Sequence, residues 1–166
     1  MRKSLISVLA LIMLLVFPLS AFADESLDST APDEFTSEFL LVEKVQSSPD
    51  SVTTQATPKP GGYGTIKCKA IGSGKMDCDW TIKLTKAGEA IQKAALVFIV
   101  DNFDGKEVGR KEKVVEPLGT NYNVLRGQET FNPGKGKFKV SKYGAVEGRK
   151  AVYEIVSVTP DVIEVK

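Results

Sequence analysis

Apolar and polar residues alternate along much of the chain, and this period of two predicts an all-β domain. Residues 65–71 and 75–82 both alternate, and the glycine-rich positions 72–74 between them are typical of a hairpin turn. Placing Cys68 opposite Cys78 gives this hairpin one definite register, which the side chains on both faces can test.

Three independent kinds of cross-strand pair agree on this register. Besides the two cysteines, it pairs Ile66 with Trp80, Ala70 with Met76, Lys67 with Asp79, Lys69 with Asp77, and Thr65 with Thr81. Apolar pairs thus share one face and opposite charges share the other, and both kinds stabilise antiparallel strands. We therefore predict a disulfide between Cys68 and Cys78, with Trp80 filling the core on the same face.

A second hairpin follows. Residues 94–100 form an unbroken apolar run, which predicts a central strand buried on both faces. Asp104 and Gly105 supply the turn, and the highly charged residues 106–115 return as a strand suited to a sheet edge. Further strands are expected at residues 134–140, 150–158 and 161–166, with turns near residues 119–121, 132–134 and 144–148. About seven short strands with turns at this spacing favour an immunoglobulin-like antiparallel β-sandwich.

The second hairpin and a later segment carry a family resemblance. The residues concerned are the apolar strand that starts at Val97, then Asp101, Asp104-Gly105-Lys106-Glu107-Val108, and Leu125-Arg126-Gly127-Gln128-Glu129 before Phe131. This part of the chain resembles the bacterial FxLyD and related immunoglobulin-like extracytoplasmic domains, which have an apolar strand ending in Asp, an Asp-Gly hairpin and a later Leu-Pro-Gly-polar turn. The resemblance implies the sandwich fold. It implies little about function, because such domains mostly lack an assigned activity.

The first residues have a different character. Two basic residues precede an uncharged apolar run at residues 5–17, and residues 21–23 (Ala-Phe-Ala) offer the small side chains that a signal peptidase accepts. This pattern predicts a secretion signal over residues 1–23 and a mature chain that works outside the cytoplasm. The run is shorter than the roughly 20 residues of a transmembrane helix, so we expect no stable membrane anchor.

Residues 24–60 differ from the rest in charge. They contain eight acidic and two basic residues, whereas residues 61–166 contain 13 acidic and 18 basic residues. We expect residues 24–60 to be a disordered acidic tether or a removable pro-segment, and residues 61–166 to be one β-sandwich domain. Within the first segment, the apolar residues of 35–45 fit a transient helix, a strand added to the sheet edge, or a segment that docks on the basic domain.

The composition narrows the chemistry. The chain has no histidine, which removes the Ser-His-Asp and Cys-His mechanisms and the commonest zinc ligand. A glycosidase with paired carboxylates would need a cleft, which one small core does not provide. The residues after Asp101 resemble a calcium loop only superficially, because the third position is Phe103, so a hairpin turn is the better interpretation. The sequence therefore predicts a non-catalytic protein without cofactor or metal.

Two sets of surface residues are candidates for binding. The first is a lysine stripe made of Lys135, Lys137, Lys139 and Lys142. Such a stripe would track an anionic polymer, or it would protect a sheet edge against pairing with other molecules. The second set lies near expected turns and would line one end of the sandwich or close the edge of its core: Tyr63, Tyr122 and Tyr143.

These observations predict a secreted, non-catalytic binding or structural module that acts at the cell exterior. Its partner would be an anionic cell-wall polymer or another extracellular protein, and the sequence leaves this choice open. The alternative is a secreted inhibitor or antimicrobial-type factor that the acidic segment keeps latent.

Overall fold

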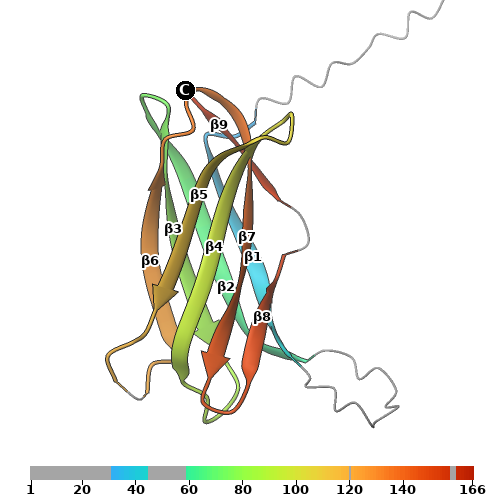
Figure 1. Ribbon diagram of the computed structural model, residues 1–166, viewed down its shortest axis with the longest axis vertical. Helices are drawn as coiled ribbons and strands as arrows, with labels where there is room; N and C mark the ends of the chain where they lie inside the picture. The colour runs from blue at the N-terminus through green and yellow to red at the C-terminus, as the bar shows by residue number, and fades with distance from the viewer. Residues whose placement is uncertain (1–30, 45–58, 120, 158–159) are drawn as a thin grey trace, which may run out of the picture. The chain divides into compact units, whose positions relative to one another are not determined.

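The computed structural model describes residues 31–44, 59–119, 121–157 and 160–166 (Figure 1). The predicted secretion signal lies outside the described residues. Within them the chain forms nine strands and no helix. The strands are β1 (Glu34–Glu43), β2 (Pro60–Gly72), β3 (Lys75–Leu84), β4 (Ile91–Asn102), β5 (Glu107–Val115), β6 (Val124–Phe131), β7 (Gly136–Gly148), β8 (Val152–Val156) and β9 (Asp161–Val165).

All nine strands belong to one antiparallel sheet. Its hydrogen-bonded order is β5-β4-β7-β8-β1-β2-β3-β6, and β9 pairs with β7. The prediction of an all-β antiparallel fold is therefore confirmed. The two-sheet arrangement of an immunoglobulin-like sandwich is not confirmed, because the strands follow one another in a single curled sheet (Figure 1).

The two end strands of this sheet, β5 and β6, come close to each other. Lys113 Nζ of β5 lies 3.1 Å from Glu129 Oε1 of β6. A Cβ atom built at Gly109 of β5 would lie 3.2 Å from the Phe131 ring of β6. No hydrogen-bonded ladder joins β5 to β6 in the part of the chain that the structure describes. We call this nearly closed gap the seam.

The hairpin of β2 and β3 has the predicted register at every pair. Cys68 lies opposite Cys78 and the two form a disulfide, and all five other expected pairs are present. The turn residues Gly72, Ser73 and Gly74 all have positive φ, a conformation that glycine adopts without steric cost. Trp80 is buried on the same inner face as the disulfide, as predicted. The disulfide indicates an oxidising environment, as outside the cytoplasm.

The apolar strand β4 is central but is not buried on both faces. Its inward residues, Ala94, Leu96, Phe98 and Val100, are buried. On the outer face Ala95 is exposed, and Val97 and Ile99 are half-buried. The prediction of two buried faces is wrong because a single curled sheet encloses the core on one side only. The charged strand β5 ends the strand order, so its predicted edge position is confirmed.

Strand β1 corrects the expectation of a tether over residues 24–60. It lies between β8 and β2 inside the sheet, and both Phe39 and Leu41 are buried. Gly64 of β2 lies opposite Phe39, and a Cβ atom there would come 2.1 Å from the ring, so glycine provides the space that the ring occupies. The expected strand is thus present, but as an internal strand and not at an edge. The rest of the acidic segment, apart from residues 31–33, 44, 59 and 60, lies outside the described residues.

Two further boundaries differ from expectation. The turn expected near residues 144–148 lies within β7, and the chain turns at Arg149 and Lys150 instead. β7 is long because it has β4 along one side, and β8 and β9 in succession along the other. The residues that the family resemblance assigns to a turn, Leu125 to Glu129, lie in strand β6. Their hydrogen-bonded partner is β3. Because β3 is far from β6 in the sequence, the local pattern of residues does not indicate this pairing.

Candidate functional site

Four exposed apolar or aromatic side chains form a row across the outer face of the sheet. They are Tyr143 of β7, Val156 of β8, Leu40 of β1 and Tyr63 of β2, and we call this row the outer band. Leu40 lies opposite both Val156 and Tyr63. The ladder between β7 and β8 ends at Ala145 and Glu154, one outward position before Tyr143 and Val156.

The outer band is well exposed. The exposed fractions are 55% for Tyr143, 45% for Val156, 48% for Leu40 and 40% for Tyr63. A single exposed apolar side chain is ordinary, but a contiguous row on neighbouring strands is the usual mark of an interaction surface. Tyrosine is also among the residues that contribute most to protein–protein binding energy.

Charged side chains of both signs surround the outer band. Glu154, two residues before Val156 on the same face of β8, forms an ion pair with Lys44 at 2.9 Å, and this contact raises the pKa of Lys44. At the other end, Lys83 Nζ lies 5.7 Å from the centre of the Tyr63 ring. An apolar centre with a mixed charged rim is the anatomy of a protein–protein interface. The convex outer side of a curled sheet suits a macromolecule better than a small ligand, which prefers a concave pocket.

The lysine stripe does not lie on a sheet edge. Over Gly136 to Val140, β7 is paired with β4 on one side and with β9 on the other, so the edge-protection hypothesis is wrong for this strand. The pairing also places Glu164 beside Lys137 and Asp101 beside Lys139. Each of these two lysines therefore has an acidic neighbour, which weakens the attraction of the stripe for a polyanion.

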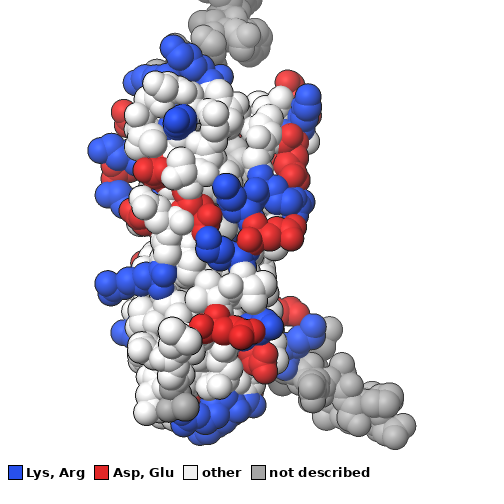
Figure 2. All heavy atoms as spheres, turned by 60° about the vertical axis from the view of Figure 1, so that its left-hand side comes forward, with Lys and Arg blue, Asp and Glu red and all other residues white. Residues whose placement is uncertain are grey.

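The same mixture of charges is visible elsewhere. On the face seen in Figure 2, basic and acidic side chains are interspersed. Lys139 Nζ lies 5.0 Å from the centre of the Phe103 ring, a further local partner. Polyanion binding by Lys135, Lys137 and Lys139 stays a prediction of the sequence.

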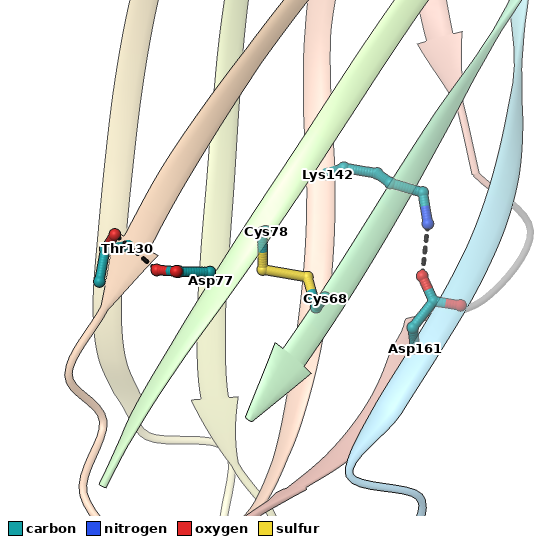
Figure 3. The surroundings of a disulfide bond; sticks show 6 residues. All are labelled: Cys68, Asp77, Cys78, Thr130, Lys142 and Asp161. Atoms are coloured by element: carbon teal, nitrogen blue, oxygen red, sulfur yellow. Dashed lines mark hydrogen bonds and ion pairs between the residues drawn. A yellow bond between two sulfur atoms is a disulfide. The ribbon is translucent and has the colours of Figure 1, made fainter. Parts of the chain in front are cut away.

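Lys142 does not belong to the exposed stripe. Its side chain is 1% exposed and points to the inner side of the sheet, where Nζ lies 2.6 Å from Asp161 Oδ2 (Figure 3). Nζ also lies 2.8 Å from the hydroxyl oxygen of Ser37. We call Lys142, Asp161 and Ser37 the interior cluster. The alternation along β7 already indicates that Lys142 points inward, because it follows the inward residues Phe138 and Val140 at intervals of two.

A second enclosed polar pair joins Tyr153 of β8 to Glu89 in the segment before β4. Burial raises the pKa of Tyr153 to about 12, and the negative charge of Glu89 adds to this rise. Glu89 is buried, and its Oε2 accepts a hydrogen bond from the backbone N–H of Lys150 at 3.2 Å. Both side chains are enclosed, so we assign them a structural role.

The remaining candidates are distributed over the molecule. Tyr63 and Tyr143 share the outer band, but Tyr122 lies in the segment before β6, so the three tyrosines do not line one end together. The calcium-like residues form the predicted hairpin turn, in which the side chain of Asn102 accepts a hydrogen bond from the backbone N–H of Lys106. Among the described residues, no group of three His, Cys, Asp or Glu side chains is placed to hold a metal ion. None of the described segments is a helix long and apolar enough to cross a membrane.

Comparison with protein-family models, with curated proteins and with solved structures finds no match to this chain. The function must therefore be argued from the surfaces of the molecule itself.

Proposed function

We propose that the protein is a secreted, non-catalytic binding module that docks on another extracellular protein through the outer band. The observation that carries the proposal is the contiguity of the row, since Leu40 is the direct neighbour of both Val156 and Tyr63. Burying the four side chains against a partner would remove these exposed apolar groups from water, which favours docking.

Two features support a location outside the cytoplasm. The Cys68–Cys78 disulfide suits an oxidising compartment. The first 23 residues have the composition of a secretion signal. A non-catalytic role rests on the composition, because a chain without histidine lacks the usual general base near neutral pH.

The alternative function, an inhibitor kept latent by a removable acidic segment, is disfavoured by strand β1. Removing residues 24–60 would take an internal strand out of the sheet and leave its neighbours β8 and β2 each unpaired along one side. It would also delete the buried side chains of Phe39 and Leu41 from the core. N-terminal sequencing of the secreted protein tests this: a start near Asp24 agrees with our proposal, and a start near Gly61 favours the latent factor.

A relation to the FxLyD-like domains stays a prediction from the sequence. The proposal does not depend on it, because those domains mostly lack an assigned activity. The immunoglobulin-like description would require two sheets, and the proposal uses only the outer face of one.

Site-specific photo-crosslinking tests the docking surface. Tyr143 is replaced by benzoylphenylalanine, and the full chain is produced in the organism that secretes it. Tyr122→benzoylphenylalanine is the matched control, because it is a tyrosine of similar exposure, 50%, outside the outer band. We expect one discrete cross-linked partner protein at Tyr143 and none at Tyr122.

A second pair of variants makes the test specific. Adding Leu40→Lys should abolish the cross-link at Tyr143, whereas Val114→Lys on the outer face of β5 should leave it intact. Cross-linking at the two tyrosines to the same extent would overturn the proposal. A cross-link only to a second copy of the chain would also overturn it, by making the outer band a self-association surface.

A further inference from the structure

The interior cluster is an unusual group to find inside a small β domain. Lys142 lies opposite Phe98 on the inner face, where most of the buried side chains are apolar. Its partner Asp161 is 17% exposed and begins strand β9. Figure 3 shows the lysine side chain reaching from β7 to Asp161, on the same inner side as the disulfide.

Burying this pair as ions is costly. Removing two charges from water costs several kcal/mol for each ion, and a buried ion pair is often no more stable than apolar residues of the same size. Among the described residues, Lys142 Nζ also donates a hydrogen bond to the hydroxyl oxygen of Ser37. A product in which the two charges are gone would avoid that desolvation cost altogether.

We propose that Lys142 and Asp161 become joined by an amide bond, an internal cross-link between β7 and β9. The geometry favours it, because the 2.6 Å contact between Nζ and Oδ2 holds the amine directly beside the carboxyl group. Holding two reacting groups together raises their effective concentration, which reaches about 10⁵ M or more in well-oriented intramolecular reactions. The strands hold Lys142 and Asp161 in place, because Val140, two residues before Lys142, is the direct partner of Asp161 in the sheet.

The reaction is a condensation that releases one water molecule. The Lys142 ammonium first transfers a proton to the Asp161 carboxylate, which leaves a neutral amine beside a neutral carboxylic acid. The nitrogen lone pair then attacks Cγ and forms the C–N bond. The C–O bond to the protonated oxygen breaks, and the hydroxyl leaves with a proton from the nitrogen as water.

Ser37 is the positioning residue for the amine. Its oxygen lies 2.8 Å from Nζ and accepts a hydrogen bond from it, which holds the nitrogen beside the carboxyl group, while its own hydroxyl is directed at the backbone oxygen of Glu38 at 3.5 Å. No electron leaves the system, and no oxidant, reductant or activating group is needed. The products are one amide and one water.

Intact mass spectrometry of the secreted full chain tests the proposal without any mutation. We expect a mass below that of the disulfide-bonded sequence by one water. Proteolysis should then give a branched peptide that carries both Lys142 and Asp161, with no tryptic cleavage after Lys142. A chain that still has the full mass of the disulfide-bonded sequence after prolonged incubation at physiological temperature would overturn the proposal. Lys142 and Asp161 would then be an ion pair.

Three variants identify the reacting atoms. Lys142→Arg keeps the positive charge but should lose no water, which excludes dehydration elsewhere in the chain. Asp161→Asn should lose ammonia in place of water and reach the same final mass as the cross-linked native chain. Ser37→Ala should lower the cross-linked fraction at a given time. Water loss that persists in Lys142→Arg would assign the reaction to another site and overturn the proposal.

Discussion

The β2–β3 hairpin and the interior cluster tie strands together in opposite ways. The hairpin joins residues ten apart in sequence through a neutral disulfide, with apolar pairs on the inner face and charged pairs on the outer face. The interior cluster joins β1, β7 and β9, with Ser37 and Lys142 separated by 105 positions, and its charged groups lie inside. The comparison shows that the pairs within the hairpin place apolar side chains inside and charged ones outside. The contact of Lys142 with residues far away in sequence places charged groups inside. Such departures mark places with a special role.

Lys142→Ala should have the largest effect on stability. The substitution removes the Lys142–Asp161 link and leaves the Asp161 carboxylate without a partner, and a buried charge left in this way costs about 3 to 5 kcal/mol of unfolding free energy. Urea unfolding followed by the fluorescence of Trp80 measures the loss. The double variant Lys142→Met with Asp161→Leu should be much less destabilised, because no charge is left buried. Equal losses in the single and double variants would show that the charge of Asp161 is not what matters.

Opening the hairpin should cost less. The double variant Cys68→Ala with Cys78→Ala removes the closure of a loop of about 11 residues, for which the chain-entropy model gives about 2.8 kcal/mol. The same urea experiment measures this, and wild type with a reductant serves as the control. If the loss exceeded that of Lys142→Ala, the hairpin and not the interior cluster would be the stronger tie.

The stability at alkaline pH should depend on Tyr153 of β8. The β2–β3 hairpin has no buried tyrosine of this kind among its strand residues. Tyr153 has a pKa of about 12 when folded, against about 10 in an unfolded chain. Its contribution is therefore complete below pH 10 and is lost as the pH rises towards 12. At pH 11 we expect wild type to lose about 1 kcal/mol more than Tyr153→Phe, relative to pH 8. Parallel pH dependence in the two proteins would contradict the assignment.

The outer face of the hairpin should give the smallest effect. Lys67 Nζ lies 2.6 Å from Oε1 of Glu34 in β1, and this contact lowers the pKa of Glu34. Lys67→Gln should return the pKa of Glu34 towards its usual range, which NMR titration of the Glu34 carboxyl group measures. The urea midpoint should hardly move, because both side chains are exposed and the pair is screened by water and salt. A large shift of the midpoint would mean that surface charge, and not the inner face, sets the register.

The sequence allows the hairpin to be predicted in full because all of its evidence is local. The two strands follow one another directly through a recognisable turn, so a single register satisfies every pair. Strand β1 is different. Its apolar residues are visible in the sequence, but its partners β2 and β8 are far apart in the chain, and the acidic composition around it points to disorder. The path of the sheet follows from those distant pairings.

The same limit applies to the functional surfaces. Nothing local indicates that Leu40 and Val156 are neighbours, so the outer band becomes visible only in the folded sheet. Alternation does place Lys142 on the inner side of β7, but its partner Asp161 follows only from the pairing of β9. A residue's face can be predicted from its own strand, whereas its neighbours cannot.

The seam between β5 and β6 has a consequence for the order of folding. These strands are consecutive in sequence but stand at opposite ends of the hydrogen-bonded order, with six strands between them. The contact of Lys113 with Glu129 therefore joins residues 16 apart in the chain only after the intervening strands, β1 among them, have assembled. This contact between residues close in sequence therefore forms only as fast as the long-range strand pairing, which is slow. A distance probe across the seam would report the completion of the sheet, and not the formation of the neighbouring turn.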